Sequence, residues 1–128
     1  MKGINNLMGK VQSLFRFQSL NIWKLANEIG DELFDLADEL KRRKLYRFAE
    51  QLRGASLSVS YNIAEGAGSD SAKDFGRFLN YARRSVFENA NMILMLVRRN
   101  LAEESQADVL LGKLVVLSKQ ITQFKRCP

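Results

Sequence analysis

The chain contains almost nothing that would interrupt a helix. Its only proline is the last residue, Pro128, and only eight of its 128 residues are glycine. Proline lacks a backbone donor and clashes with the preceding helical turn, so its absence allows long helices. Leu, Ala, Lys, Arg and Glu, which favour helices, are abundant. The sequence therefore predicts an all-α protein.

Apolar residues recur at helical spacing in four long segments. The predicted helices run from about Ser19 to Lys41, Leu45 to Glu65, Ser71 to Arg99 and Glu103 to Phe124. Because the connections between them are short, successive helices should be antiparallel. The length suits one domain with one core, so we expect an up-down-up-down four-helix bundle over residues 17–128.

An N-terminal extension, residues 1–16, has an amphipathic pattern of its own. Its apolar positions have helical spacing: Ile4, Leu7, Met8, Val11, Leu14 and Phe15. Such a helix could pack on its own bundle, on a neighbouring subunit or on a membrane surface, and we favour packing on protein. No apolar run in the chain approaches the roughly 20 residues of a membrane span.

Glycines and a serine mark the junction between the second and third helices. We expect Gly66 to act as a C-terminal glycine cap, with Gly68 also in the break. Ser71 and Asp74 match a capping box in which Asp replaces the usual Glu.

Polar residues flank the buried stripes of the same two helices: Asn62, Glu65, Ser85 and Glu88. We expect them to form hydrogen bonds across the helical hairpin, rather than a ligand site. Arg84 and Glu88, four residues apart, can also pair. Because a glutamate at a helix C-terminus is disfavoured by the helix dipole, we expect Glu65 to have a specific partner.

The third helix carries the run MILMLV, Met92 to Val97, which is apolar on every side. A helix that is apolar all round is buried all round. In so short a chain the second covering surface is most simply another subunit. The candidate interface residues on the third and fourth helices are Met92, Leu94, Met95, Val97, Val109 and Val116.

The residue inventory excludes most catalytic chemistry. Histidine is absent, which removes the usual general base and the commonest metal ligand. The one cysteine, Cys127, cannot form an intrachain disulfide, and it fits a cytoplasmic location. Asp31, Asp35 and Asp38 are interpreted as a solvated helix face. We expect no enzyme activity, no catalytic residues, no cofactor and no metal.

The net charge of +6 favours acidic partners, nucleic acid first. Arg77 and Arg84 lie on one stripe of the third helix, and Arg43 and Arg47 are four residues apart near the start of the second. Solvated charges or surface ion pairs are the alternative interpretation. The candidate nucleic-acid-binding residues are Arg42, Arg43, Lys44, Arg47, Arg77, Arg83, Arg84, Arg98 and Arg99.

The segment from Gln51 to Ile93 resembles a known signature. The matching positions are Gln51, Leu52, Arg53, Ala55, Ser58, Asn62, Ile63, Ala64, Glu65, Gly66, Phe75, Phe78, Leu79, Ala82, Ser85 and Glu88. It is similar to that of bacterial four-helix bundle proteins encoded in 23S ribosomal RNA intervening sequences, the so-called S23 ribosomal protein family. Residues 17–29 resemble the opening of the family's first helix.

The resemblance implies a cytoplasmic, left-handed bundle that forms a homo-oligomeric ring, typically a pentamer. It also implies a fold similar to the accessory variability determinant of diversity-generating retroelements, which binds nucleic acid and a reverse transcriptase. The chain departs from the family pattern at Gly54, Ser69 and Arg84, so its arginine surface is redistributed.

Two hypotheses for function follow. The first is a non-enzymatic oligomeric bundle that binds structured RNA or DNA through a basic surface. The second is a protein-interaction scaffold or adaptor that recruits a partner protein and has no direct role with nucleic acid.

Overall fold

The computed structural model of the protein describes residue 12 and residues 14–127. A short 3-10 helix, η1 (Arg16–Ser19), precedes four long helices: α2 (Asn21–Arg42), α3 (Tyr46–Ala67), α4 (Ala72–Arg98) and α5 (Glu104–Arg126). Their bounds lie within two or three residues of those predicted from the apolar spacing.

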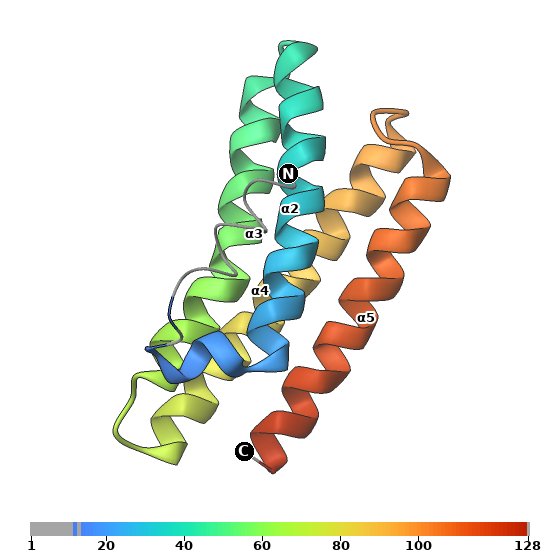
Figure 1. Cartoon of the computed structure of the whole chain (residues 1–128). Coiled ribbons are helices and arrows are strands. Elements are labelled where there is room, and N and C mark those ends of the chain that lie inside the picture. The colour runs from blue at the N-terminus through green and yellow to red at the C-terminus, as the bar shows by residue number, and fades with distance from the viewer. Residues whose placement is uncertain (1–11, 13, 128) are drawn as a thin grey trace.

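The four helices form a single up-down-up-down bundle, as predicted (Figure 1). Each long helix packs on its neighbour in sequence, and α5 also lies against α2. The predicted apolar stripes meet at the centre. The largest side chains that are almost completely buried there are Ile29, Leu33, Leu40, Leu52, Ile63, Leu79, Ile93, Leu96, Leu110, Leu114, Leu117 and Ile121. The left-handed winding implied by the resemblance stays a prediction.

Most of the predicted N-terminal amphipathic helix lies outside the described residues. Its last two apolar positions, Leu14 and Phe15, are exposed and precede η1 without being helical themselves. The η1 segment contacts α2 and α3, and the Arg16 guanidinium lies 5.3 Å from the centre of the Phe75 ring.

Gly66 has a different role from the predicted glycine cap. Helix α3 continues through Gly66 to Ala67, and the residue after it, Gly68, has right-handed dihedral angles. Gly66 is buried, and a Cβ atom there would lie 2.7 Å from Phe78 Cβ and 2.8 Å from Phe75 Cδ1. The glycine therefore permits close packing of α3 on α4, and the expectation of a glycine cap was wrong.

The left-handed positions that end helices are held by other residues. Among the described residues, positive φ angles occur at Lys44 (63°) and Asn100 (58°) and at no glycine. At each of these turns the next leucine closes the helix, because the Leu45 amide donates to the Leu40 carbonyl at 2.9 Å and the Leu101 amide to the Leu96 carbonyl at 2.8 Å. This is the Schellman pattern of helix termination.

Replacing Lys44 with glycine should stabilise the protein. A side chain in the left-handed conformation costs about 1–2 kcal/mol, which exceeds the entropy that glycine adds to the unfolded chain. We expect Lys44→Gly to raise the free energy of unfolding by about 0.5–1 kcal/mol, measured by urea denaturation. Asn100→Gly should give a smaller gain, because asparagine tolerates this conformation. A lower free energy of unfolding in Lys44→Gly than in wild type would contradict the left-handed conformation of Lys44.

Asn89 is the most deeply buried polar residue, 1% exposed. Its Nδ2 donates a long hydrogen bond of 3.3 Å to the Ala55 carbonyl, and its Oδ1 is buried with no partner among the described residues. An unpaired buried acceptor costs about 1–3 kcal/mol, so Asn89→Leu, which keeps the number and branching of the side-chain heavy atoms, should stabilise the bundle by roughly 1 kcal/mol. Asn89→Ala, which leaves a cavity, should not. A denaturation midpoint that is lower for Asn89→Leu than for Asn89→Ala would contradict this prediction.

Candidate nucleic-acid interface

The nine basic residues predicted to bind nucleic acid are all exposed, and the fold separates them into two groups. The basic end, as we name it, consists of Arg42, Arg43, Lys44, Arg47, Arg98 and Arg99. The α4 side group consists of Arg77, Arg83 and Arg84.

The basic end is assembled from parts of the chain that are far apart in sequence. The turn between α2 and α3 and the turn between α4 and α5 lie at the same end of the bundle (Figure 1). A surface cavity at this end has Arg42 and Arg43 on one side and residues 100–104 on the other. Arg43 and Arg47 were predicted to lie on one helix, but the structure separates them. Arg43 is the C-cap of α2, and α3 begins only at Tyr46.

Four carboxylates line the cavity at the basic end, those of Asp35, Glu39, Glu103 and Glu104, and among the described residues only Glu39 pairs with a basic-end cation. That cation is Arg42. Within the described part of the chain no ion pair is formed by the other five basic-end residues, Arg43, Lys44, Arg47, Arg98 and Arg99. Carboxylates of α2 are used elsewhere: Glu32 pairs with Lys113 at 3.0 Å and Asp38 with Arg53 at 2.6 Å.

The α4 side group is partly occupied by contacts within its own helix. Arg77 pairs with Asp74 at 2.6 Å and lies 5.1 Å from the centre of the Phe78 ring. Arg83 lies 5.0 Å from the centre of the Phe87 ring. Phe87 was not among the candidate residues, although an aromatic side chain off the apolar stripe of α4 indicates an exposed contact. Arg84 makes no ion pair with a described residue.

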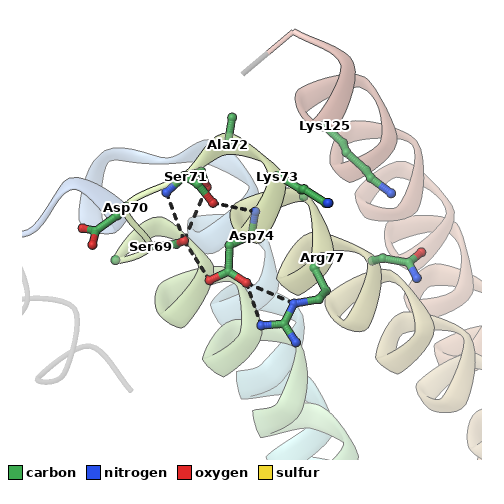
Figure 2. A pocket seen from close by; sticks show the side chains of 11 residues that line it. Ser69, Asp70, Ser71, Ala72, Lys73, Asp74, Arg77 and Lys125 are labelled. Carbon is green, nitrogen blue, oxygen red and sulfur yellow. Dashed lines mark hydrogen bonds and ion pairs between the residues drawn. The ribbon is translucent and has the colours of Figure 1, made fainter.

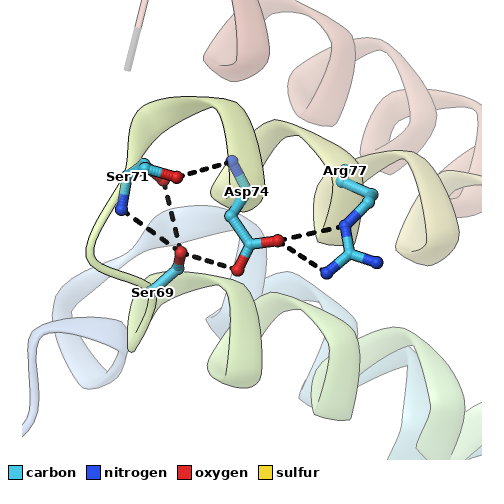
Figure 3. A network of polar contacts seen from close by, with 4 residues as sticks. All are labelled: Ser69, Ser71, Asp74 and Arg77. Atoms are coloured by element: carbon cyan, nitrogen blue, oxygen red, sulfur yellow. Dashed lines mark hydrogen bonds and ion pairs between the residues drawn. The ribbon is translucent and has the colours of Figure 1, made fainter.

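The junction between α3 and α4 carries a surface cavity of about 1050 Å³, with Lys73, Arg77 and Lys125 on its wall (Figure 2). Polar contacts hold the start of α4 in place (Figure 3). Ser71 Oγ accepts a hydrogen bond from the Asp74 amide at 3.0 Å, which is the predicted N-cap.

The capping box itself is incomplete. The Asp74 carboxylate accepts hydrogen bonds from Ser69 Oγ at 2.8 Å and from Arg77 at 2.6 and 3.0 Å. The Ser71 amide instead donates to Ser69 Oγ at 3.3 Å. Aspartate is one carbon shorter than the glutamate of the usual box, and its carboxylate is held by these other donors.

Removing the Asp74 carboxylate should have a pH-dependent effect on stability. Hydrogen bonds from Arg77, and secondarily from Ser69, lower the pKa of Asp74 below its ordinary value. The stabilisation is therefore present at neutral pH and is lost as the pH falls through the folded-state pKa. Thermal unfolding of Asp74→Asn and wild type should differ at pH 7 and converge in acid. Asp70→Asn removes the same charge from this loop and is the control; a constant difference at every pH would contradict the prediction.

Asn62 and Ser85, two of the four polar residues expected to bridge the hairpin, join Ser58 in a compact network of hydrogen bonds between α3 and α4. Ser58 Oγ and Ser85 Oγ lie 2.7 Å apart and link α3 to α4. Asn62 Nδ2 donates to the Ser58 carbonyl at 2.8 Å and to its Oγ at 3.2 Å. Glu65 is exposed and makes no ion pair with another described residue, and Arg84 and Glu88 do not pair. The hairpin is thus linked through serines, and the partner expected for Glu65 is not seen.

The candidate interface residues divide by burial. Met92 is only 8% exposed and belongs to the core of its own bundle, and Met95 and Val97 are half-buried. Leu94, Val109 and Val116 are exposed, and two further apolar residues on the same helices, Phe87 and Val115, join them. The run from Met92 to Val97 is therefore covered on most sides within one chain, with Leu94 left exposed. That a second subunit covers the remaining side stays a prediction.

Neither a metal site nor a membrane-spanning helix occurs in the part of the chain that the structure describes. Among residue 12 and residues 14–127, no group of three or more His, Cys, Asp or Glu side chains could hold a metal ion. Over the same residues, no helix is long and apolar enough to cross a membrane.

The fold defines the chain as a small all-α up-down bundle, with six exposed basic residues at the end formed by the α2–α3 and α4–α5 turns. A model of the 23S rRNA-intervening sequence protein family matches residues 18–123, so the chain belongs to this family. It is also similar to the crystal structure of a protein of unknown function from the S23 ribosomal protein family of Bacteroides thetaiotaomicron. The TM-score is 0.77 at 19% identity, over 81% of this chain and 97% of that chain. No curated protein matches.

Proposed function

We propose that the protein is a non-enzymatic, homo-oligomeric bundle that binds RNA or DNA through its basic end. The observation that supports this most is the convergence of the α2–α3 turn and the α4–α5 turn at one end of the bundle. This convergence places Arg43, Lys44 and Arg98 at the same end, each without an ion pair to another described residue.

Unpaired cations at one end suit a phosphate backbone. Each phosphate neutralised by a lysine or arginine releases condensed counterions, which supplies much of the affinity for nucleic acid. An arginine already paired with a carboxylate must first give up that pair. The five basic-end residues without ion pairs are therefore better phosphate ligands than Arg77, which is held by Asp74.

Self-association would multiply this basic surface. Exposed apolar side chains on α4 and α5, among them Phe87 (57% exposed) and Leu94 (55%), support it, because exposed apolar clusters commonly mark interaction sites. The ring of typically five subunits and the cytoplasmic location are what the family resemblance implies. Light scattering at micromolar concentration should give a mass of several chains; a stable monomer would contradict the homo-oligomer.

A salt titration tests the binding proposal. We expect the purified protein to bind a labelled RNA hairpin in fluorescence anisotropy at low salt. The logarithm of the association constant should fall linearly with the logarithm of the salt concentration, by roughly 0.7–0.9 per phosphate contacted. No binding at low ionic strength, or binding that is insensitive to salt, would contradict the proposal.

The second candidate is a protein-interaction scaffold, which the same exposed apolar residues favour. It predicts a stable partner protein that purifies with the bundle, and no affinity for the hairpin at low salt. Charge reversal at the basic end would then leave the partner bound, whereas a charged residue in place of Leu94 would release it.

A further inference from the structure

A third surface cavity, of about 340 Å³, lies between α3 and α4. It contains residues that the proposed function does not use. It is lined by Ser58, Asn62, Tyr81, Arg84, Ser85 and Glu88. None of these side chains is aliphatic, and four of them, Ser58, Asn62, Ser85 and Glu88, match the family signature. The cavity is therefore more polar than most small-ligand sites, and its volume is at the lower end of their range.

The floor of this cavity is fixed by hydrogen bonds. Ser85 is only 7% exposed, and its Oγ lies 2.7 Å from Ser58 Oγ. Asn62 uses its Nδ2 on the Ser58 carbonyl and hydroxyl. Its Oδ1, which can accept two hydrogen bonds, is then the amide atom left for a ligand.

The rim carries opposite charges that do not neutralise each other. Arg84 and Glu88 are one turn apart on α4, a spacing that favours an ion pair. They nevertheless form none with each other or with another described residue. Tyr81, one turn before Arg84, adds a partly exposed ring that packs edge-on against Phe78 and has the Arg77 guanidinium 5.8 Å from its centre. The cavity thus offers a free carboxylate, a free guanidinium and an aromatic ring side by side on one helix.

We propose that this cavity binds an unpaired guanine nucleotide of the nucleic acid, an inference that rests on the proposed function. Guanine alone among the four bases carries two adjacent donors on its Watson–Crick edge, N1–H and the N2 amino group. These two donors match the two oxygens of the Glu88 carboxylate. Adenine and cytosine place an acceptor beside their amino group, and uracil places carbonyls on both sides of its single donor, so each would face the carboxylate with a lone pair.

The other lining residues suit the rest of the nucleotide. Tyr81 and Glu88 are seven residues apart, about 10 Å along the helix, which is close to the length of a nucleoside. Stacking on an aromatic ring and hydrogen bonds to the exposed edge are the usual means of reading an unpaired base. Arg84, between them, lies beside the base, and its guanidinium plane can stack on the base.

The position of the cavity also connects it to the basic end. Arg84, Asn91 and Arg98 follow at seven-residue intervals along α4, and all three are exposed. Arg98 lies about 20 Å along the helix from Arg84, a distance that a few nucleotides of single strand can span. One strand can therefore contact the basic end and place a base in the cavity.

The test compares eight-nucleotide RNAs of uridine that carry one central guanosine, adenosine or inosine, by fluorescence anisotropy. Wild-type protein should bind the guanosine strand about 10-fold more tightly than the adenosine strand. The inosine strand, which lacks only the N2 amino group, should lose most of this preference. Glu88→Gln should remove the difference between guanosine and inosine and leave affinity for the adenosine strand unchanged.

Glu65→Gln is the matched control. It makes the same substitution in the same family motif, but Glu65 does not line the cavity, so the preference for guanosine should remain. Equal affinity of wild type for all three strands overturns the guanine site while leaving the proposed function intact. If no strand binds, the hairpin titration still decides the proposed function, and NMR titration with guanosine monophosphate decides the site. Amide shifts confined to the cavity residues support the site, and no shifts at millimolar nucleotide overturn it.

Discussion

Replacing Gly66 with alanine is expected to destabilise the bundle by about 2 kcal/mol or more. The added Cβ would lie 2.7 Å from Phe78 Cβ, which is fixed to the backbone of α4 and cannot move away by rotating. The Phe75 ring at 2.8 Å closes the other side. Helices α3 and α4 would have to separate at their tightest contact, and the core leucines packed around it would lose contacts.

The same substitution at Gly54 is the matched control. Gly54 lies on the same helix, and an alanine Cβ at this position would have no neighbouring side chain within 4 Å. Alanine is also the better helix former by about 0.5–1 kcal/mol. Gly54→Ala should therefore stabilise the protein in urea denaturation, while Gly66→Ala does the reverse. Similar changes in the two variants would show that Gly66 is not a packing residue.

Neutralising the basic end is expected to have the largest effect on binding. The triple variant Arg43→Gln, Lys44→Gln and Arg98→Gln removes three cations without adding repulsion. If each contacts one phosphate, affinity for an RNA hairpin should fall about 100-fold at roughly 100 mM salt, and the salt slope should decrease by about 2 to 3. Fluorescence anisotropy over a range of salt concentrations measures both.

A second triple variant gives the control for net charge. Lys73→Gln, Lys125→Gln and Arg126→Gln remove the same charge from the opposite end of the bundle, where Lys73 and Lys125 line the large cavity (Figure 2). The affinity and salt slope of this variant should stay within a few-fold of wild type. If both triple variants lose affinity equally, binding follows net charge and has no preferred end.

The helices and the core were predictable because they depend on local spacing. Leu33, Leu79 and Leu114 lie on the apolar stripes that helical spacing defines, and each is buried. Because the helices contain no proline and the connections between them are short, antiparallel neighbours were the simplest arrangement.

The role of each glycine was not predictable in the same way. A glycine near the end of a helix suggests a left-handed cap, yet Gly66 is required by the Phe78 side chain of the next helix. Conversely, Lys44 adopts the left-handed conformation because Leu45 gains burial against the core. Both outcomes depend on tertiary contacts that single-residue propensity does not contain.

The candidate interface could be predicted only as a set of residue types. Sequence gives the positions of arginines along each helix, but it does not say which carboxylate each one meets or which turns share an end. Arg98 and Lys44 are far apart in sequence and lie at one end of the bundle (Figure 1). Arg77, which looked equally available, is held by Asp74.

The most direct test of the central proposal is an amide NMR map of the protein as an RNA hairpin is added at low salt. The proposal predicts the largest shifts at residues 41–47 and 98–104, the two turns of the basic end. Residues 119–126, at the opposite end of α5, should change little. Shifts concentrated in residues 119–126, or no shifts at either turn, would contradict a nucleic-acid interface at the basic end.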